Sequence, residues 1–78
     1  MKNDTSIGLF IRETRKSLGI NQQKLADISG VGINFISQIE KGKETVRLDT
    51  TNKVLNTLGY RLVPEKIVSE NITEDKYD

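Results

Sequence analysis

The sequence contains no cysteine and no histidine, and its single proline is Pro64. Without cysteine, the chain can form neither a disulfide framework nor a thiolate zinc site. Without histidine, it lacks the commonest metal ligand and the commonest general base. We therefore expect no metal site, no cofactor and no enzymatic activity. The first residues form no hydrophobic signal segment, and no apolar run approaches membrane-spanning length, so we expect a cytoplasmic protein with no membrane partner.

Acidic residues are scarce in most of the chain. Residues 1–64 carry ten lysines and arginines against six aspartates and glutamates, a net charge of +4. Residues 65–78 reverse the balance with two against five, a net charge of −3. At 78 residues, the chain is long enough for one small domain with a tail. A basic body is compatible with a polyanionic partner, and, on charge alone, also with an ordinary solvated surface.

The spacing of apolar residues predicts four helices, over residues 7–18, 22–28, 33–40 and 48–58. Ser6 and Asn21 are good N-caps for the first two helices, and Gly19 ends the first. The glycine-containing segment 29–32 is predicted to be a sharp turn between the second helix and the third. Residues 1–59 are therefore expected to form an all-α domain.

A short strand is predicted over residues 60–64, where Tyr60, Arg61, Leu62 and Val63 alternate and Pro64 ends the pattern. One strand cannot satisfy its own backbone hydrogen bonds, and no other segment reads as a strand. We therefore expect it to pair with the same strand of a second copy in a homodimer. The alternative is an extended tail on the surface of the monomer. The acidic residues 65–78 are predicted to be a disordered tail.

The third helix, residues 33–40, has two different sides. On a helical wheel, Phe35, Ile36 and Ile39 share the core side, whereas Asn34, Ser37, Gln38 and Lys41 share the opposite side, with Ile33 at its edge. The outer side carries no carboxylate, although solvated helix faces usually mix lysine with glutamate. An outer face of this kind is suited to lie against an anion.

Amide side chains also suit the reading of base edges. Asparagine and glutamine offer a donor and an acceptor side by side, which match adenine N6 and N7 in the major groove, and Ile33 is placed to touch a thymine methyl group. A short helix, a glycine turn and a second helix form the helix-turn-helix arrangement. The amides of Gln22 and Gln23 begin the preceding helix, where a phosphate can bind. Lys41 and Lys43 follow the outer face and are expected to hold the DNA backbone.

The segment 21–43, NQQKLADISGVGINFISQIEKGK, resembles the helix-turn-helix of the Cro/lambda-repressor (Xre-type) family. The matching positions are Gln22, Leu25-Ala26, Gly30-Val31, Ile36-Ser37 and Glu40-Lys41-Gly42-Lys43. The resemblance implies a DNA-binding protein with base-reading residues at Ile33, Asn34, Ser37 and Gln38. It also implies phosphate contacts from Gln22, Lys41 and Lys43.

Two positions depart from the family pattern, and one pair follows from it. Gly32 starts the recognition helix where the family usually has serine or threonine, and Thr51 replaces a larger apolar residue. The resemblance further implies that Arg15 pairs with Glu40 and pins the orientation of the recognition helix. The alternative for Arg15 is a free surface side chain that reaches for a phosphate.

The following segment 46–63, VRLDTTNKVLNTLGYRLV, resembles the HipB-like antitoxins. That likeness implies a homodimer that binds a palindromic operator, represses its own operon and binds a HipA-type kinase toxin. A stand-alone repressor of phage or plasmid type, without a toxin, is one alternative. A protein-interaction module that has lost DNA binding is another.

Overall fold

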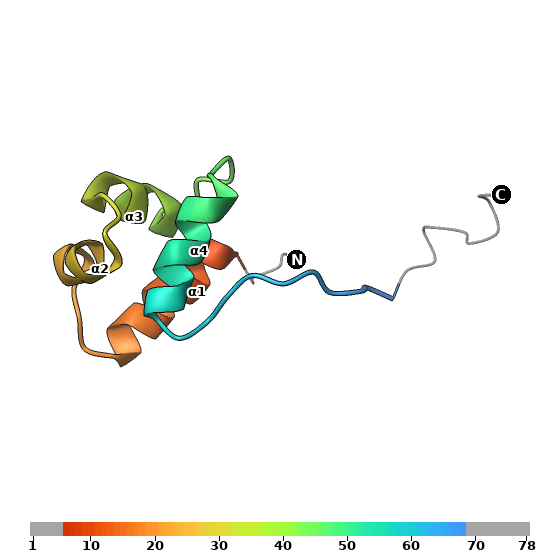
Figure 1. Cartoon of the computed structure of the whole chain (residues 1–78), viewed down its shortest axis with the longest axis horizontal. Helices are drawn as coiled ribbons and strands as arrows, with labels where there is room; N and C mark the ends of the chain where they lie inside the picture. Colours follow the sequence, from red (N-terminus) through yellow and green to blue (C-terminus); the bar gives the residue numbers. More distant parts are fainter. Residues whose placement is uncertain (1–5, 69–78) are drawn as a thin grey trace, which may run out of the picture.

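The computed structural model describes residues 6–68; the beginning of the chain and most of the predicted acidic tail, residues 69–78, lie outside the described residues. Its helices are α1 (Ile7–Ser17), α2 (Gln22–Ser29), α3 (Ile33–Glu40) and α4 (Leu48–Thr57). The four predicted helices are thus confirmed to within a residue at their ends. Figure 1 shows them grouped together, with the segment after α4 leading away from them. No described helix is long and apolar enough to cross a lipid bilayer.

Side-chain caps fix where the first two helices begin. The Ser6 hydroxyl accepts a hydrogen bond from the Leu9 N–H at 3.1 Å, and the Asn21 carboxamide oxygen accepts one from the Lys24 N–H at 2.7 Å. Each cap satisfies an N–H group that the first helical turn leaves without a backbone partner. Gly32 at the start of α3 provides no such bond.

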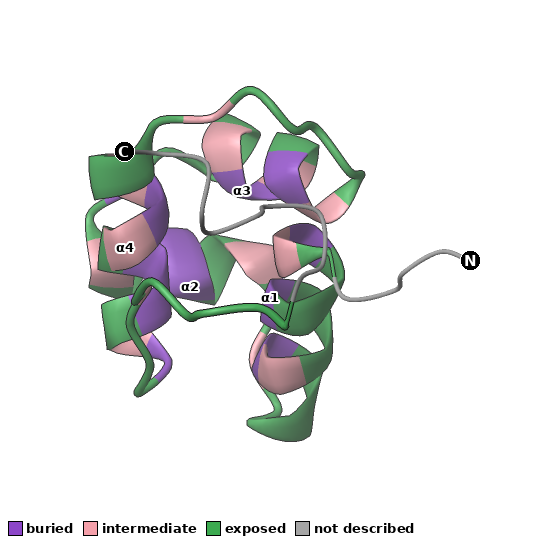
Figure 2. Cartoon of the chain, turned by 90° about the vertical axis from the view of Figure 1, so that its right-hand side faces the viewer, coloured by how far each residue is buried: buried purple, intermediate pink, exposed green. Residues whose placement is uncertain are grey.

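The core lies between the four helices, whose buried faces turn toward one another (Figure 2). Ile11 of α1, Leu25 of α2, Ile36 and Ile39 of α3 and Val54 of α4 are completely buried. Thr51, at a position where an apolar residue is usual, is buried as well. Its hydroxyl donates to the carbonyl of Arg47, the N-cap residue of α4, at 2.7 Å, so the polar group has a hydrogen-bond partner.

Gly8 allows α1 to pack directly on the end of α3. A Cβ atom at this position would overlap the Ile39 carbonyl oxygen and lie 3.3 Å from the Glu40 Cα atom. Glycine is therefore required here by the close approach of two backbones rather than by an unusual backbone conformation. The contact places α1 against the helix that carries the outer face.

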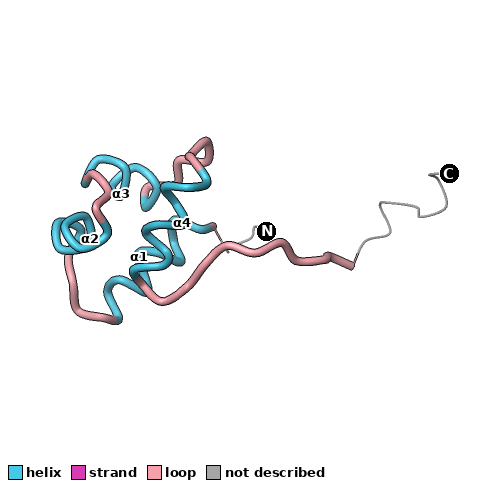
Figure 3. The backbone as a smooth tube through the Cα atoms, in the orientation of Figure 1, coloured by secondary structure: helices cyan, strands magenta, loops and turns pink. Residues whose placement is uncertain are grey.

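The predicted strand at Tyr60–Val63 is not formed, and the described residues 6–68 contain no strand (Figure 3). The segment is extended, but its first hydrogen bonds go to α4. The Tyr60 N–H donates to the Leu55 carbonyl at 2.8 Å, and the Leu62 N–H donates to the Asn52 side chain at 2.9 Å. A strand needs a second extended segment beside it, and these residues offer none.

Tyr60 also contacts helix α1. Its ring packs edge-to-face on Phe10 of α1, with 4.8 Å between the ring centroids. Leu62 packs against the core, whereas Arg61 and Val63 are exposed. The alternation that predicted a strand is thus satisfied by an extended segment lying over α1 and α4.

Candidate nucleic-acid interface

The outward face of α3 is open to solvent. Asn34 and Gln38 are exposed, Ile33 is 38% exposed and Ser37 is half-buried. The opposite side of the same helix carries two of the completely buried core residues, Ile36 and Ile39. This face therefore carries two amides, a hydroxyl and an isoleucine side by side, where a molecule outside the domain can contact them.

The turn before α3 brings this helix against α2. Gly30 ends α2 in the left-handed conformation, with φ of +75°, and Val31 then enters the core. Gly32 has an ordinary extended backbone, and a Cβ at that position would meet no other atom within 4 Å. Gly32 therefore leaves open space at the start of α3, where a DNA backbone can approach closely.

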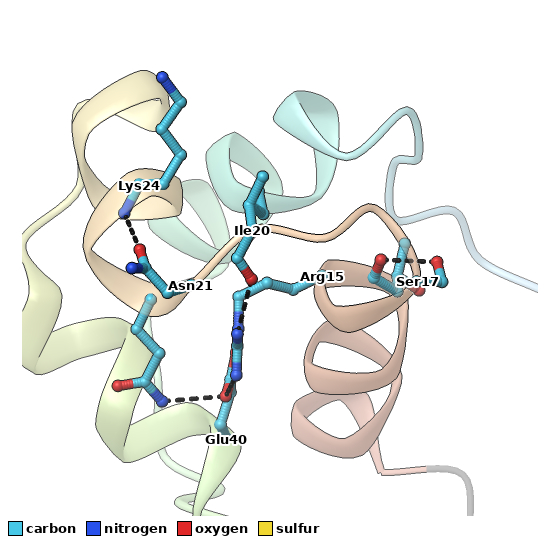
Figure 4. A network of polar contacts seen from close by, with 8 residues as sticks. Arg15, Ser17, Ile20, Asn21, Lys24 and Glu40 are labelled. Atoms are coloured by element: carbon cyan, nitrogen blue, oxygen red, sulfur yellow. Dashed lines mark hydrogen bonds and ion pairs between the residues drawn. The ribbon is translucent and has the colours of Figure 1, made fainter.

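Arg15 and Glu40 form a buried ion pair that joins α1 to the end of α3 (Figure 4). The guanidinium donates from Nε to one carboxylate oxygen at 2.8 Å and from Nη2 to the other at 2.9 Å. The side chains of the two residues are only 9% and 3% exposed. A third bond runs from Arg15 Nη1 to the Ile20 carbonyl at 2.9 Å. Arg15 thus binds Glu40 in a bidentate manner, and this geometry fixes the orientation of α3 relative to α1.

The pKa of Glu40 reflects this pairing. Burial by itself raises the pKa, but the hydrogen bonds from Arg15 and Gln22 and the charges of Arg15 and Arg12 outweigh it, so the pKa is lowered. The pKa of Arg15 is raised, chiefly by its hydrogen bond to Glu40. Glu40 is thus an ionised carboxylate turned into the domain and away from the outer face of α3.

The amides at the start of α2 have partners within the domain. Gln22 donates from Nε2 to Glu40 Oε1 at 2.9 Å, and it therefore links α2 to the Arg15–Glu40 pair. Gln23 donates from Nε2 to Asp27 at 2.9 Å on the exposed side of α2. Each amide nitrogen has two N–H bonds, so one remains on each for a phosphate.

The two lysines after α3 differ in their surroundings. Both are exposed, but the Lys43 ammonium donates to the Gln38 side-chain oxygen at 3.2 Å, whereas Lys41 makes no side-chain hydrogen bond within residues 6–68. The structure thus places Lys43 beside a predicted base-reading residue. Lys41 is available as a point charge next to the outer face.

Sequence reasoning missed three features of this region. Gly8 carried a detectable signal, because a glycine inside an apolar helical repeat costs stability unless a close contact requires it. The hydrogen bond between Lys43 and Gln38 carried none, because it depends on the path of the turn after α3. The hydrogen bond between Gln22 and Glu40 carried none either, because it depends on how the start of α2 packs against the end of α3.

Residues 8–73 match the protein family described as "Helix-turn-helix domain". A protein of Sinorhizobium fredii, named as an uncharacterized HTH-type transcriptional regulator, is 39% identical over 59 residues, which cover 76% of this chain and 78% of that protein. A protein of Haemophilus influenzae with the same description is 43% identical over 49 residues, which cover 63% of this chain and half of that protein. The chain therefore belongs to the Xre-type helix-turn-helix family of DNA-binding transcriptional regulators.

Proposed function

We propose that this protein is a sequence-specific transcriptional repressor that reads its operator with the outer face of α3. The observation that carries the proposal is the exposed, carboxylate-free set of Ile33, Asn34 and Gln38. The only carboxylate of α3, Glu40, is held inside by Arg15. Asn34 and Gln38 hydrogen-bond base edges, Ser37 bonds either a base or a phosphate, and Ile33 contacts a thymine methyl group.

The remaining contacts position the protein on the duplex. Lys41 binds a phosphate beyond the C-terminal end of α3, and Gln22 and Gln23 bind another with their remaining N–H groups. The open space at Gly32 admits the backbone of the DNA to the start of α3. Promoter occlusion by the bound protein then prevents transcription.

Substitutions at two exposed residues test this proposal. Asn34→Ala removes one base contact and is expected to reduce discrimination at one base pair by about 1–3 kcal/mol. Lys41→Ala is expected to weaken binding to all sequences alike and to lower the slope of log K against log salt by about 1. Affinities for duplexes selected from a random library, measured at several salt concentrations, give both quantities. An Asn34→Ala variant with unchanged preference excludes Asn34 as a base reader, and sequence-selective weakening by Lys41→Ala contradicts its phosphate role.

The proposed repressor acts as a homodimer through residues 60–63. In an extended segment, successive N–H groups point to opposite edges. The N–H groups of Tyr60 and Leu62 donate to α4, whereas those of Arg61 and Val63 donate no hydrogen bond within residues 6–68 and remain for pairing with a second copy. Two recognition helices would then face a palindromic operator with half-sites about 34 Å apart.

The proposed biological role is that of a HipB-like antitoxin that represses its own operon and binds a HipA-type kinase toxin. Support comes from the resemblance of residues 46–63 to that group and from the extended segment that follows α4. Expression with the genes that flank its own gene is expected to yield a stoichiometric companion that arrests growth when expressed alone. Elution of the protein by itself, as a DNA-binding dimer, would instead establish a stand-alone repressor without a toxin. Loss of DNA binding with a retained protein partner would establish an interaction module.

A further inference from the structure

The turn after α3 brings Lys43 back over the helix that it follows. Gly42 has a φ of +103°, the Gly42 N–H donates to the Ile39 carbonyl at 3.0 Å, and the Lys43 N–H donates to the Gln38 carbonyl at 3.1 Å. These two bonds form a Schellman motif, which closes a helix with a glycine in the left-handed conformation. The backbone of Lys43 is therefore fixed beside Gln38.

The side chains of Lys43 and Gln38 are also joined by a hydrogen bond. The Lys43 ammonium lies 3.2 Å from Gln38 Oε1. An ammonium group can only donate, so it selects the oxygen of the amide and not the nitrogen. The amide is planar, so fixing its oxygen toward Lys43 directs Nε2 away from it. Within residues 6–68, Gln38 Nε2 makes no hydrogen bond, and its two N–H groups are free to meet DNA.

The orientation of this amide matters for the reading of bases. A glutamine that can rotate by half a turn presents either a donor or an acceptor to the same base edge, and it therefore discriminates poorly. In the major groove, adenine N7, guanine N7 and O6 and thymine O4 are acceptors, whereas adenine N6 and cytosine N4 are donors. Cytosine is therefore the one base that offers no acceptor there. A glutamine whose nitrogen is directed at the base favours the acceptors over cytosine.

We propose that Lys43 is a positioning residue for DNA recognition, which holds the Gln38 amide with its nitrogen toward the base and thereby excludes cytosine at that position. This role rests on the proposed function of α3, and it replaces the phosphate contact that the resemblance implies for Lys43. Lys43 acts through Gln38 and needs no contact with a base itself.

The test is Lys43→Met, which keeps the aliphatic stem and removes the donor. Operator duplexes come from random-library selection with the wild-type protein, and the Gln38→Ala variant identifies the base pair that Gln38 contacts. At that base pair, Lys43→Met is expected to reduce the preference against cytosine roughly tenfold, within the range of one base contact. The preferences at all other base pairs stay as in the wild-type protein. Lys43→Arg, which retains a donor, is expected to keep the preference.

Lys41→Met is the matched control. It also removes one lysine charge, two residues earlier in the chain, but the Lys41 side chain makes no hydrogen bond to Gln38. It is expected to weaken all duplexes equally. If Lys43→Met does the same, Lys43 is a phosphate contact and the positioning role is wrong, although the proposed function stands. A wild-type protein without any sequence preference would overturn the proposed function and the positioning role together. Thermal unfolding of each variant shows whether the fold has changed.

Discussion

Replacement of Arg15 by methionine should lower the free energy of unfolding by about 3–5 kcal/mol at pH 7, because it leaves a buried carboxylate without its counter-charge. Arg15 makes both charged hydrogen bonds to Glu40, and the Gln22 amide is the one side-chain partner that would remain within the described residues. The loss is a large part of the stability of a small domain, which is about 5–15 kcal/mol. Denaturant unfolding of the wild-type and Arg15→Met proteins measures it.

The double variant Arg15→Met/Glu40→Leu separates the cost of an unpaired charge from the value of the pair. Replacing both members of a buried pair by apolar residues is often neutral or stabilising. We therefore expect the double variant to recover more than half of the lost stability. A double variant as unstable as Arg15→Met would show that the arginine stabilises the domain in another way, for instance through the Ile20 carbonyl.

The pH dependence of the two proteins provides an independent signature of the pair. In the wild type, the pKa of Glu40 is lowered on folding, so its contribution is fully present above the unfolded value of about 4.3 and is lost as the pH falls through the folded value. In Arg15→Met, burial still raises the pKa of Glu40 and only the Gln22 hydrogen bond and the Arg12 charge oppose it, so the pKa is higher than in the wild-type protein. The difference in stability should therefore shrink between pH 7 and pH 3. Asp49, whose pKa is lowered to about 2 by Arg47, titrates alike in both proteins and cancels.

Gly8→Ala should destabilise the domain by about 3 kcal/mol, at the upper end of the usual cost of overpacking. The new Cβ would meet the Ile39 carbonyl oxygen, which is backbone and cannot rotate aside, so α1 must move away from α3. Helix propensity alone predicts the opposite result, because alanine is favoured over glycine by about 1 kcal/mol inside a helix. The sign of the change in denaturant midpoint therefore decides between the two effects.

Gly32→Ser is the matched control for Gly8→Ala. A Cβ at residue 32 lies in open space, and the backbone there is extended with φ of −63°. Serine also supplies the N-cap hydroxyl that α3 lacks, which is worth about 1 kcal/mol or less relative to glycine. The free energy of unfolding of the Gly32→Ser protein should stay constant or rise slightly. A stable Gly8→Ala protein would mean that α1 and α3 are farther apart than the structure has them.

The helices could be predicted because their signals are local. Ser6 and Asn21 act within one turn, and the apolar repeat of α3 depends only on helical geometry. The same repeat separated the exposed Asn34 and Gln38 from the buried Ile36 before any packing was known.

The features that could not be predicted depend on how distant segments meet. The alternation at Tyr60–Val63 is equally compatible with a strand and with an extended segment on α4, and only the position of Asn52 decides where the Leu62 N–H bonds. The pairing of Lys43 with Gln38 likewise follows from the turn at Gly42. Residue types alone left Lys43 as one more cation near a DNA-binding helix.

Reading of a DNA sequence by the outer face of α3 is tested most directly by a ratio of two affinities. The wild-type protein is first used to select duplexes from a random library, and its affinities for a selected duplex and a scrambled one are measured at one salt concentration. We predict a ratio of roughly a thousandfold or more, the lower end for specific DNA-binding proteins. The double variant Asn34→Ala/Gln38→Ala should lose most of that ratio while keeping its affinity for the scrambled duplex. Equal wild-type affinities for the two duplexes, or an unchanged ratio in the double variant, would contradict sequence reading by this face.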